Sequence, residues 1–165
     1  MDQQIYKAYV DILKEELVPA MGCTEPIAVA YAGALARQTL GCTPERTQLI
    51  VSGNIIKNVK SVIVPHTGGR KGLRTAVAAG ICCGNVDKGL QVLADVNEED
   101  IKNLADFLEK ADITISESDS LCPFDIQVRV FAGSNVETAF VRIAGKHTNV
   151  VRIEKNGKVL KDTGY

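Results

Sequence analysis

The fold class is decided by Ile126-Gln127-Val128-Arg129-Val130 and Ala139-Phe140-Val141-Arg142-Ile143, in which apolar side chains stand at every second position. This period places successive side chains on opposite faces of a β-strand. Residues 113–115 and 149–153 show the same pattern, and the turn residues Gly133-Ser134-Asn135 separate two of the stretches. We therefore expect an antiparallel sheet with one solvated face.

The first half of the chain carries helical patterns. Residues 2–17 have apolar side chains at helical spacing, which predicts an amphipathic helix. Thr24 can cap a second helix over 27–40, which is Ala-rich and apolar on nearly all sides, so this helix should be buried. Residues 73–80 and 101–110 predict two more helices, and Asn97 can cap the second of them.

Two further β-branched runs, 47–52 and 61–64, predict strands joined by a short polar segment around Asn58. Lys155-Asn156-Gly157-Lys158 carries the Asn-Gly signal of a tight hairpin. Together the patterns predict an α+β fold with N-terminal helices packed on a mainly antiparallel sheet. We expect residues 1–165 to form a single domain of this kind.

Composition excludes several classes of function. Nineteen Lys and Arg against twenty Asp and Glu leave a net charge of −1 in 165 residues, so the sequence predicts no nucleic-acid partner. It also contains no apolar run of the roughly 18 residues that would span a membrane. An odd number of cysteines without a secretory signal favours reduced thiols, and we expect a soluble cytoplasmic protein. The cysteines are Cys23, Cys42, Cys82, Cys83 and Cys122.

Two glycine-containing segments are candidate ligand sites. Gly22-Cys23-Thr24-Glu25 begins a helix, where free N–H groups and the helix dipole can hold an anion or expose a thiolate. A buried cysteine beside a capped helix gives the same pattern. Thr67-Gly68-Gly69 can form a nest of amides for a carboxylate, or simply a flexible surface turn.

Asn54 and Asn58 follow the first predicted strand, where their amides either stabilise a turn or orient a small polar ligand. Neighbouring residues on a helix point about 100° apart, so Cys82-Cys83 is interpreted as helix packing rather than a metal clamp.

Three blocks of sequence resemble the L-cysteine desulfidase family, iron–sulfur lyases related to the serine dehydratase alpha chain. They are Val18-Pro19-Ala20-Met21-Gly22-Cys23-Thr24-Glu25-Pro26-Ile27-Ala28-Val29-Ala30, Ser52-Gly53-Asn54-Ile55-Ile56-Lys57-Asn58-Val59 and Val64-Pro65-His66-Thr67-Gly68-Gly69. The family often has Asn in place of His66. Its proteins are more than twice as long, so the resemblance implies that this chain is the N-terminal part of a longer lyase.

The resemblance implies α,β-elimination of L-cysteine to sulfide, ammonia and pyruvate, without pyridoxal phosphate. A 4Fe-4S cluster would be held by three cysteines, with Cys23 as one metal ligand. The other ligands would come from the C-terminal remainder of the enzyme, so we expect the isolated chain to lack the cluster and to be inactive. The implied substrate-binding residues for a small amino acid are Thr24, Glu25, Asn54, Asn58, Thr67, Gly68 and Gly69.

Several alternatives stay open at this point. Serine dehydratase relatives eliminate water instead of sulfide, and the sequence does not choose between the two substrates. The chain can also be a non-catalytic small-ligand-binding domain derived from the family. The catalytic base is unknown. The oligomeric state is also open, and a homo-oligomer is one possibility.

Overall fold

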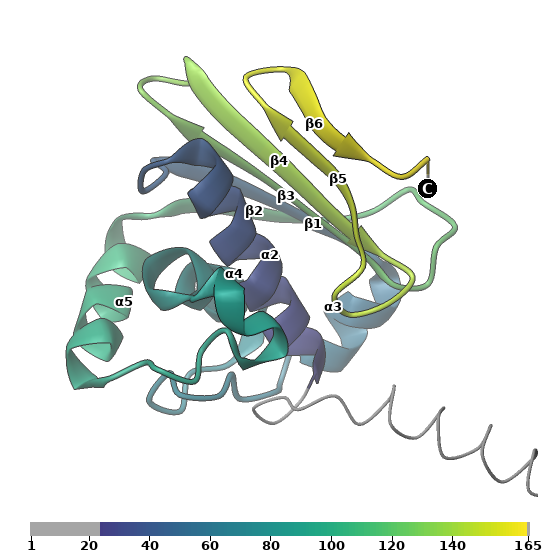
Figure 1. Cartoon of the computed structure of the whole chain (residues 1–165). Coiled ribbons are helices and arrows are strands. Elements are labelled where there is room, and N and C mark those ends of the chain that lie inside the picture. Colours follow the sequence, from purple (N-terminus) through teal and green to yellow (C-terminus); the bar gives the residue numbers. More distant parts are fainter. Residues whose placement is uncertain (1–23, 165) are drawn as a thin grey trace, which may run out of the picture.

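The computed structural model describes residues 24–164, which form a six-stranded sheet with helices packed against one side of it (Figure 1). The strand order is β2-β1-β3-β4-β5-β6. The helices are α2 (Thr24–Leu40), α3 (Gly53–Val59), α4 (Gly72–Cys83), the 3-10 helix η1 (Val86–Gln91) and α5 (Glu98–Lys110). The strands are β1 (Arg46–Val51), β2 (Asp112–Glu117), β3 (Asp125–Ala132), β4 (Glu137–Ala144), β5 (Val150–Lys155) and β6 (Lys158–Asp162).

The predicted α+β class is confirmed. β3 pairs with β1 and β4, β5 with β4, and β6 with β5, all antiparallel, whereas β2 pairs with β1 in parallel. Ile126, Val128 and Val130 of β3 are fully buried and face the helices. The alternation seen in the sequence thus separates a buried from a more exposed sheet face.

Helix α2 is the centre of the helical layer and packs against α4 on one side and against β3 and β4 on the other. Its Ala-rich sequence explains this position, because small side chains on all sides let several elements approach its backbone. At the contact with α4 the approach is closest: a Cβ atom on Gly80 would overlap the carbonyl oxygen of Ala30. Within residues 24–164, no helix is long and apolar enough to cross a membrane.

Two local predictions between β1 and α4 are wrong. The polar segment predicted as a turn is helix α3, because Ile55 and Val59 stand four residues apart and bury one helical face against the core. Residues 61–64 form no strand. Ile63 makes an isolated bridge with Lys71, and its side chain is 53% exposed. The expected helix over residues 2–17 lies outside the described residues.

Two predictions that rest on turn and cap chemistry are confirmed. Asn156 and Gly157 join β5 to β6 with φ angles of 52° and 80°, the left-handed conformation that a two-residue hairpin turn requires. Asn97 caps α5 by accepting from the N–H of Asp100, whose side chain accepts in return from the N–H of Asn97.

We expect Gly80→Ala to destabilise the protein, although alanine is the better helix former. The added Cβ would meet the backbone of Ala30, which cannot move without shifting α2. Overpacking of this kind costs about 1–3 kcal/mol. Urea unfolding followed by circular dichroism measures the change, with Cys83→Ala on the same helix as the control. Unchanged or increased stability of Gly80→Ala would contradict the close contact.

Candidate functional site

The structure brings two of the predicted site segments into contact. Glu25 lies in the first turn of α2 and Asn58 in the last turn of α3, and the Asn58 Nδ2 donates a hydrogen bond of 3.3 Å to the Glu25 Oε1. Thr24 and Glu25 are partly buried, whereas Asn54 and Asn58 are exposed. The two segments are 33 residues apart in the chain, so this contact depends on the fold.

The loop between Val64 and Arg70 contains the third predicted segment. Thr67 is 1% exposed, and its hydroxyl donates to the carbonyl oxygen of Val64 at 2.7 Å. This bond closes the turn, so the Thr67 hydroxyl serves the loop rather than a ligand. Gly68 and Gly69 follow with φ angles of 73° and 86° and are exposed.

The backbone of this loop leaves donors free. Within the described residues, the N–H groups of positions 66–69 reach no backbone acceptor. Gly68 lies beside α5, since a Cβ built on it would stand 3.4 Å from Ile101 Cγ2. Arg74, one of the basic residues after the loop, instead donates to the carbonyl oxygens of Leu108 and Ala111 and ties α4 to the end of α5.

Cys82 and Cys83 show no sign of a reactive thiolate. Burial is the largest cause that raises the pKa of Cys82 to about 12 and that of Cys83 to about 11, and Asp100 raises both further while Arg37 lowers them. Both thiols are therefore protonated at neutral pH, as packing residues would be. Cys23 lies outside the described residues, so its predicted role as a ligand is untested.

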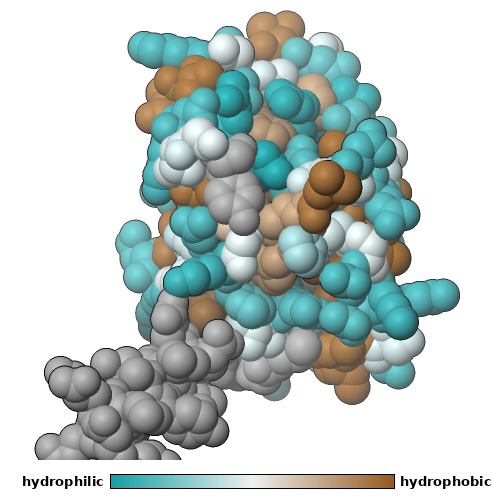
Figure 2. All heavy atoms as spheres, turned by 90° about the vertical axis from the view of Figure 1, so that its right-hand side faces the viewer, coloured by the Kyte–Doolittle hydropathy of each residue, from teal (hydrophilic) through white to brown (hydrophobic). Residues whose placement is uncertain are grey.

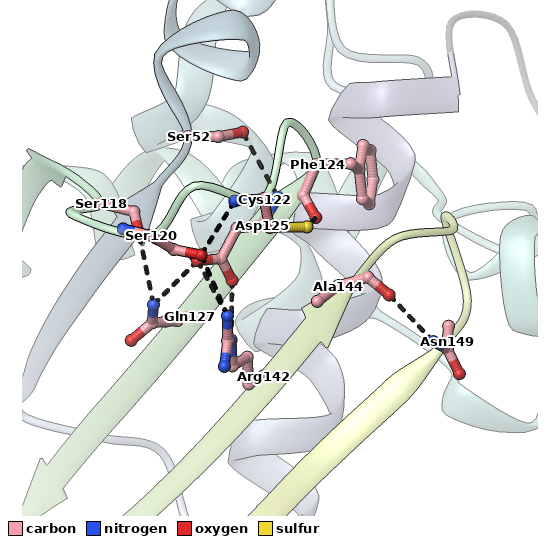
Figure 3. A network of polar contacts seen from close by, with 10 residues as sticks. All are labelled: Ser52, Ser118, Ser120, Cys122, Phe124, Asp125, Gln127, Arg142, Ala144 and Asn149. Carbon is pink, nitrogen blue, oxygen red and sulfur yellow. Dashed lines mark hydrogen bonds and ion pairs between the residues drawn. The ribbon is translucent and has the colours of Figure 1, made fainter. Parts of the chain in front are cut away.

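A second polar cluster surrounds Asp125 at the start of β3 (Figure 3). The Asp125 side chain is 0% exposed and accepts from Ser118 Oγ at 2.8 Å, Gln127 Nε2 at 3.1 Å and Arg142 Nε at 2.9 Å. The N–H of Asp125 donates to the Oγ of Ser52, just before α3. A carboxylate this deeply buried needs such compensation, because an unpaired charge would destabilise the fold.

The same cluster fixes the connection between β2 and β3. Arg142 Nη2 donates to Ser120 Oγ at 3.3 Å, and Ser120 Oγ also accepts from the N–H of Cys122. An open hollow of about 540 Å³ lies beside it. The hollow is lined by Ile50, Ser116, Glu117, Ser118, Asp119, Ser120, Gln127 and Arg142. Most of its hydroxyl and amide groups already make hydrogen bonds within the protein, so the main role of the cluster is to hold the β2–β3 connection in place.

Sequence analysis did not identify this cluster. Asp125 and Arg142 are 17 residues apart, and the register that places Gln127 opposite Arg142 makes them diagonal neighbours on adjacent strands. The available signal was an Asp at the start of a strand whose other side chains alternate. Its partner can be assigned only when the strand register is known.

Large hydrophobic side chains are scattered over the described surface. Figure 2 shows mainly hydrophilic atoms on the side of the molecule where β6 and α3 lie, interrupted by separate hydrophobic groups. The exposed ones are Ile63, Ile115, Leu121, Val136, Val159 and Leu160, of which only Val159 and Leu160 belong to the same segment, β6. An interface on the described surface therefore depends mainly on polar and charged groups.

Comparison with known proteins finds relatives over nearly the whole chain. The chain is 49% identical over 159 residues to a UPF0597 protein of Desulfitobacterium hafniense, a match that covers 96% of this chain and 36% of that protein. UPF0597 proteins of Treponema denticola and Finegoldia magna are both 44% identical, over 97% and 93% of this chain. The chain thus spans about a third of the length of these curated relatives. No protein-family model matches it.

These comparisons correct the expectation of an iron–sulfur lyase. The relatives are named UPF0597 proteins, and their names indicate neither an L-cysteine desulfidase nor a serine dehydratase. The assignments as a carbon–sulfur lyase, as part of such an enzyme and as a 4Fe-4S protein are therefore wrong. Within residues 24–164, no group of three or more His, Cys, Asp and Glu side chains is placed to hold a metal ion.

We expect Asp125→Asn to destabilise the fold by about 2–4 kcal/mol, because it removes the buried carboxylate that pairs with Arg142. Asn keeps the size of Asp, so the loss reports charge and hydrogen bonding rather than a cavity. Urea unfolding measures it, with the exposed Asp119→Asn as the matched control. Equal stability of both variants would contradict the role of the Asp125 cluster in holding the β2–β3 connection.

Alkylation rates test the protection of Cys82 and Cys83. A thiol with a pKa near 12 is ionised in about one molecule in ten thousand at pH 8, and thiolate is the reacting form. We expect iodoacetamide to modify the exposed Cys42 at least about 100-fold faster than Cys82 in the folded protein. Mass spectrometry of peptides resolves the sites, and comparable rates would show that the partly buried thiols on α4 are as accessible as Cys42.

Proposed function

We propose that the end of the domain formed by the start of α2, by α3 and by the 64–70 loop binds a small amino-acid-like molecule. The observation that carries this proposal is the hydrogen bond between Glu25 and Asn58, which joins two segments singled out independently in the sequence. No reaction is assigned to this binding.

The chemistry of the segments supports a ligand with two opposite charges. Glu25 offers a carboxylate that is only partly buried and accepts from one amide, which suits an ammonium group. The exposed backbone of Gly68 and Gly69 offers N–H donors in a left-handed turn, which suits a carboxylate. A small amino acid carries both groups. In Figure 1, α3 and the start of α2 lie at the same end of the molecule.

A cytoplasmic location is proposed alongside this function. Cys42, Cys82 and Cys83 are free thiols in the structure, which fits a reducing compartment.

Binding of L-alanine tests the proposal. In nuclear magnetic resonance titrations of the 165-residue chain we expect L-alanine to shift the amide signals of residues 25, 58, 68 and 69, and acetate and ethylammonium to do so more weakly. Glu25→Gln should lower the affinity at least about tenfold, because it removes the charge that meets the ammonium. The control is Glu98→Gln, an exposed residue in the first turn of α5.

Two results would contradict the proposal. One is the absence of shifts at these four positions for every small amino acid tested. The other is equal affinity of wild type and Glu25→Gln, which would mean that Glu25 serves only to tether α2 to α3.

A further inference from the structure

The sheet face opposite the helices carries two arginine–phenylalanine pairs. Arg46 on β1 stands opposite Phe131 on β3, and Arg129 on β3 stands opposite Phe140 on β4. Each guanidinium lies over the ring of its partner, with the Arg Cζ 4.0 Å and 4.5 Å from the ring centroids. Figure 1 shows the described helices on the other side of the sheet, so this face is not covered by them.

The arginines of this face differ in how they are neutralised. Arg142 pairs with Asp125, and Arg152 pairs with Glu154 at 2.7 Å and Asp162 at 2.9 Å. Within residues 24–164, neither Arg46 nor Arg129 makes an ion pair or a side-chain hydrogen bond.

Asp112 does not supply the missing charge. Asp112 of β2 stands opposite Arg46 of β1. The Arg46 guanidinium, however, lies over Phe131 on β3, the other neighbouring strand, and forms no ion pair with Asp112. Two positive charges therefore remain on neighbouring strands without a counter-charge. A ring beneath each guanidinium fixes its plane and leaves the N–H edge available, while Arg46 Nε itself is buried without an acceptor.

The two arginines occupy neighbouring positions on the sheet. Gln48 stands opposite Arg129, and Arg46 lies two residues before Gln48, so Arg46 and Arg129 are diagonal neighbours across β1 and β3. Diagonal positions on a sheet are roughly 7–8 Å apart. Like charges at this separation repel, and an anionic partner with two adjacent carboxylates would remove the repulsion and accept from both N–H edges.

We propose that this face, defined by Arg46, Arg129, Phe131 and Phe140, is a docking surface for an acidic surface of another polypeptide. None of the four residues lines the hollow beside Asp125, and a broad strand face suits a macromolecule better than a metabolite. A polypeptide is favoured over nucleic acid because the chain has a net charge of −1. Arginine and aromatic side chains are also the residues that dominate binding energy in protein interfaces. This inference is independent of the ligand site at Glu25.

Fluorescence anisotropy tests the surface with a labelled 12-residue peptide of alternating Glu and Ser as the probe. We expect the double variant Arg46→Gln, Arg129→Gln to bind at least about tenfold more weakly than wild type, with a smaller dependence on salt. The control is Lys102→Gln with Lys110→Gln, which removes the same charge from exposed positions on α5. Resonance shifts of residues 46, 129, 131 and 140 in the wild-type chain, on addition of the peptide, give a readout that does not depend on folding of the variants.

Three outcomes would overturn the docking surface. The first is equal peptide affinity of the double variant and the lysine control, since the effect would then be one of net charge. The second is a set of peptide-induced shifts confined to other residues. The third is that a single-stranded oligonucleotide with as many negative charges binds more tightly than the peptide and that the same double variant weakens this binding. That result would identify nucleic acid as the partner.

Discussion

The approach of α2 to α4 is the constraint on which the rest of the structure depends. The two helices approach each other most closely at glycines: a Cβ on Gly80 would overlap the backbone of Ala30, and one on Gly33 would stand 2.7 Å from the carbonyl oxygen of Val77. Because α2 also packs on β3 and β4, its position between α4 and the sheet sets the distance between the helical layer and the sheet. It also sets where the first turn of α2, with Glu25, stands relative to α3.

The two faces of the sheet solve different physical problems. The inner face buries Val128, Val141 and Ile143 completely against the helices. The outer face is amphipathic: Phe140 points away from the helices but is 7% exposed, in part because Arg129 lies across its ring. A long cationic side chain can cover an aromatic ring while keeping its charged head in water. This arrangement stabilises a sheet face that no described helix covers, and it also leaves the N–H edges of the guanidinium groups available to a partner.

Sequence patterns predicted those parts of the fold that depend on neighbours in the chain. Alternation predicted β3 and β4, and the Asn156-Gly157 turn and the Asn97 cap followed from local backbone requirements. Helix α3 was missed because its single buried face comprises few residues within a polar segment. The parallel pairing of β2 with β1 was missed because it is set by the path of the chain through α3, α4 and α5 rather than by either strand.

The candidate sites differ from the predicted ones for a related reason, which is that a side chain is available to a ligand only where the fold has not already engaged it. Thr67 has the right chemistry for a ligand but closes its own turn. Asp125 and Arg142 form a charged cluster at the start of β3, yet they neutralise each other and hold the β2–β3 connection. By this criterion we propose functional surfaces only where charges lack full compensation. Glu25 meets the criterion at the α2–α3 contact, where its partner is a neutral amide, and the stacked arginines meet it on the outer face of the sheet.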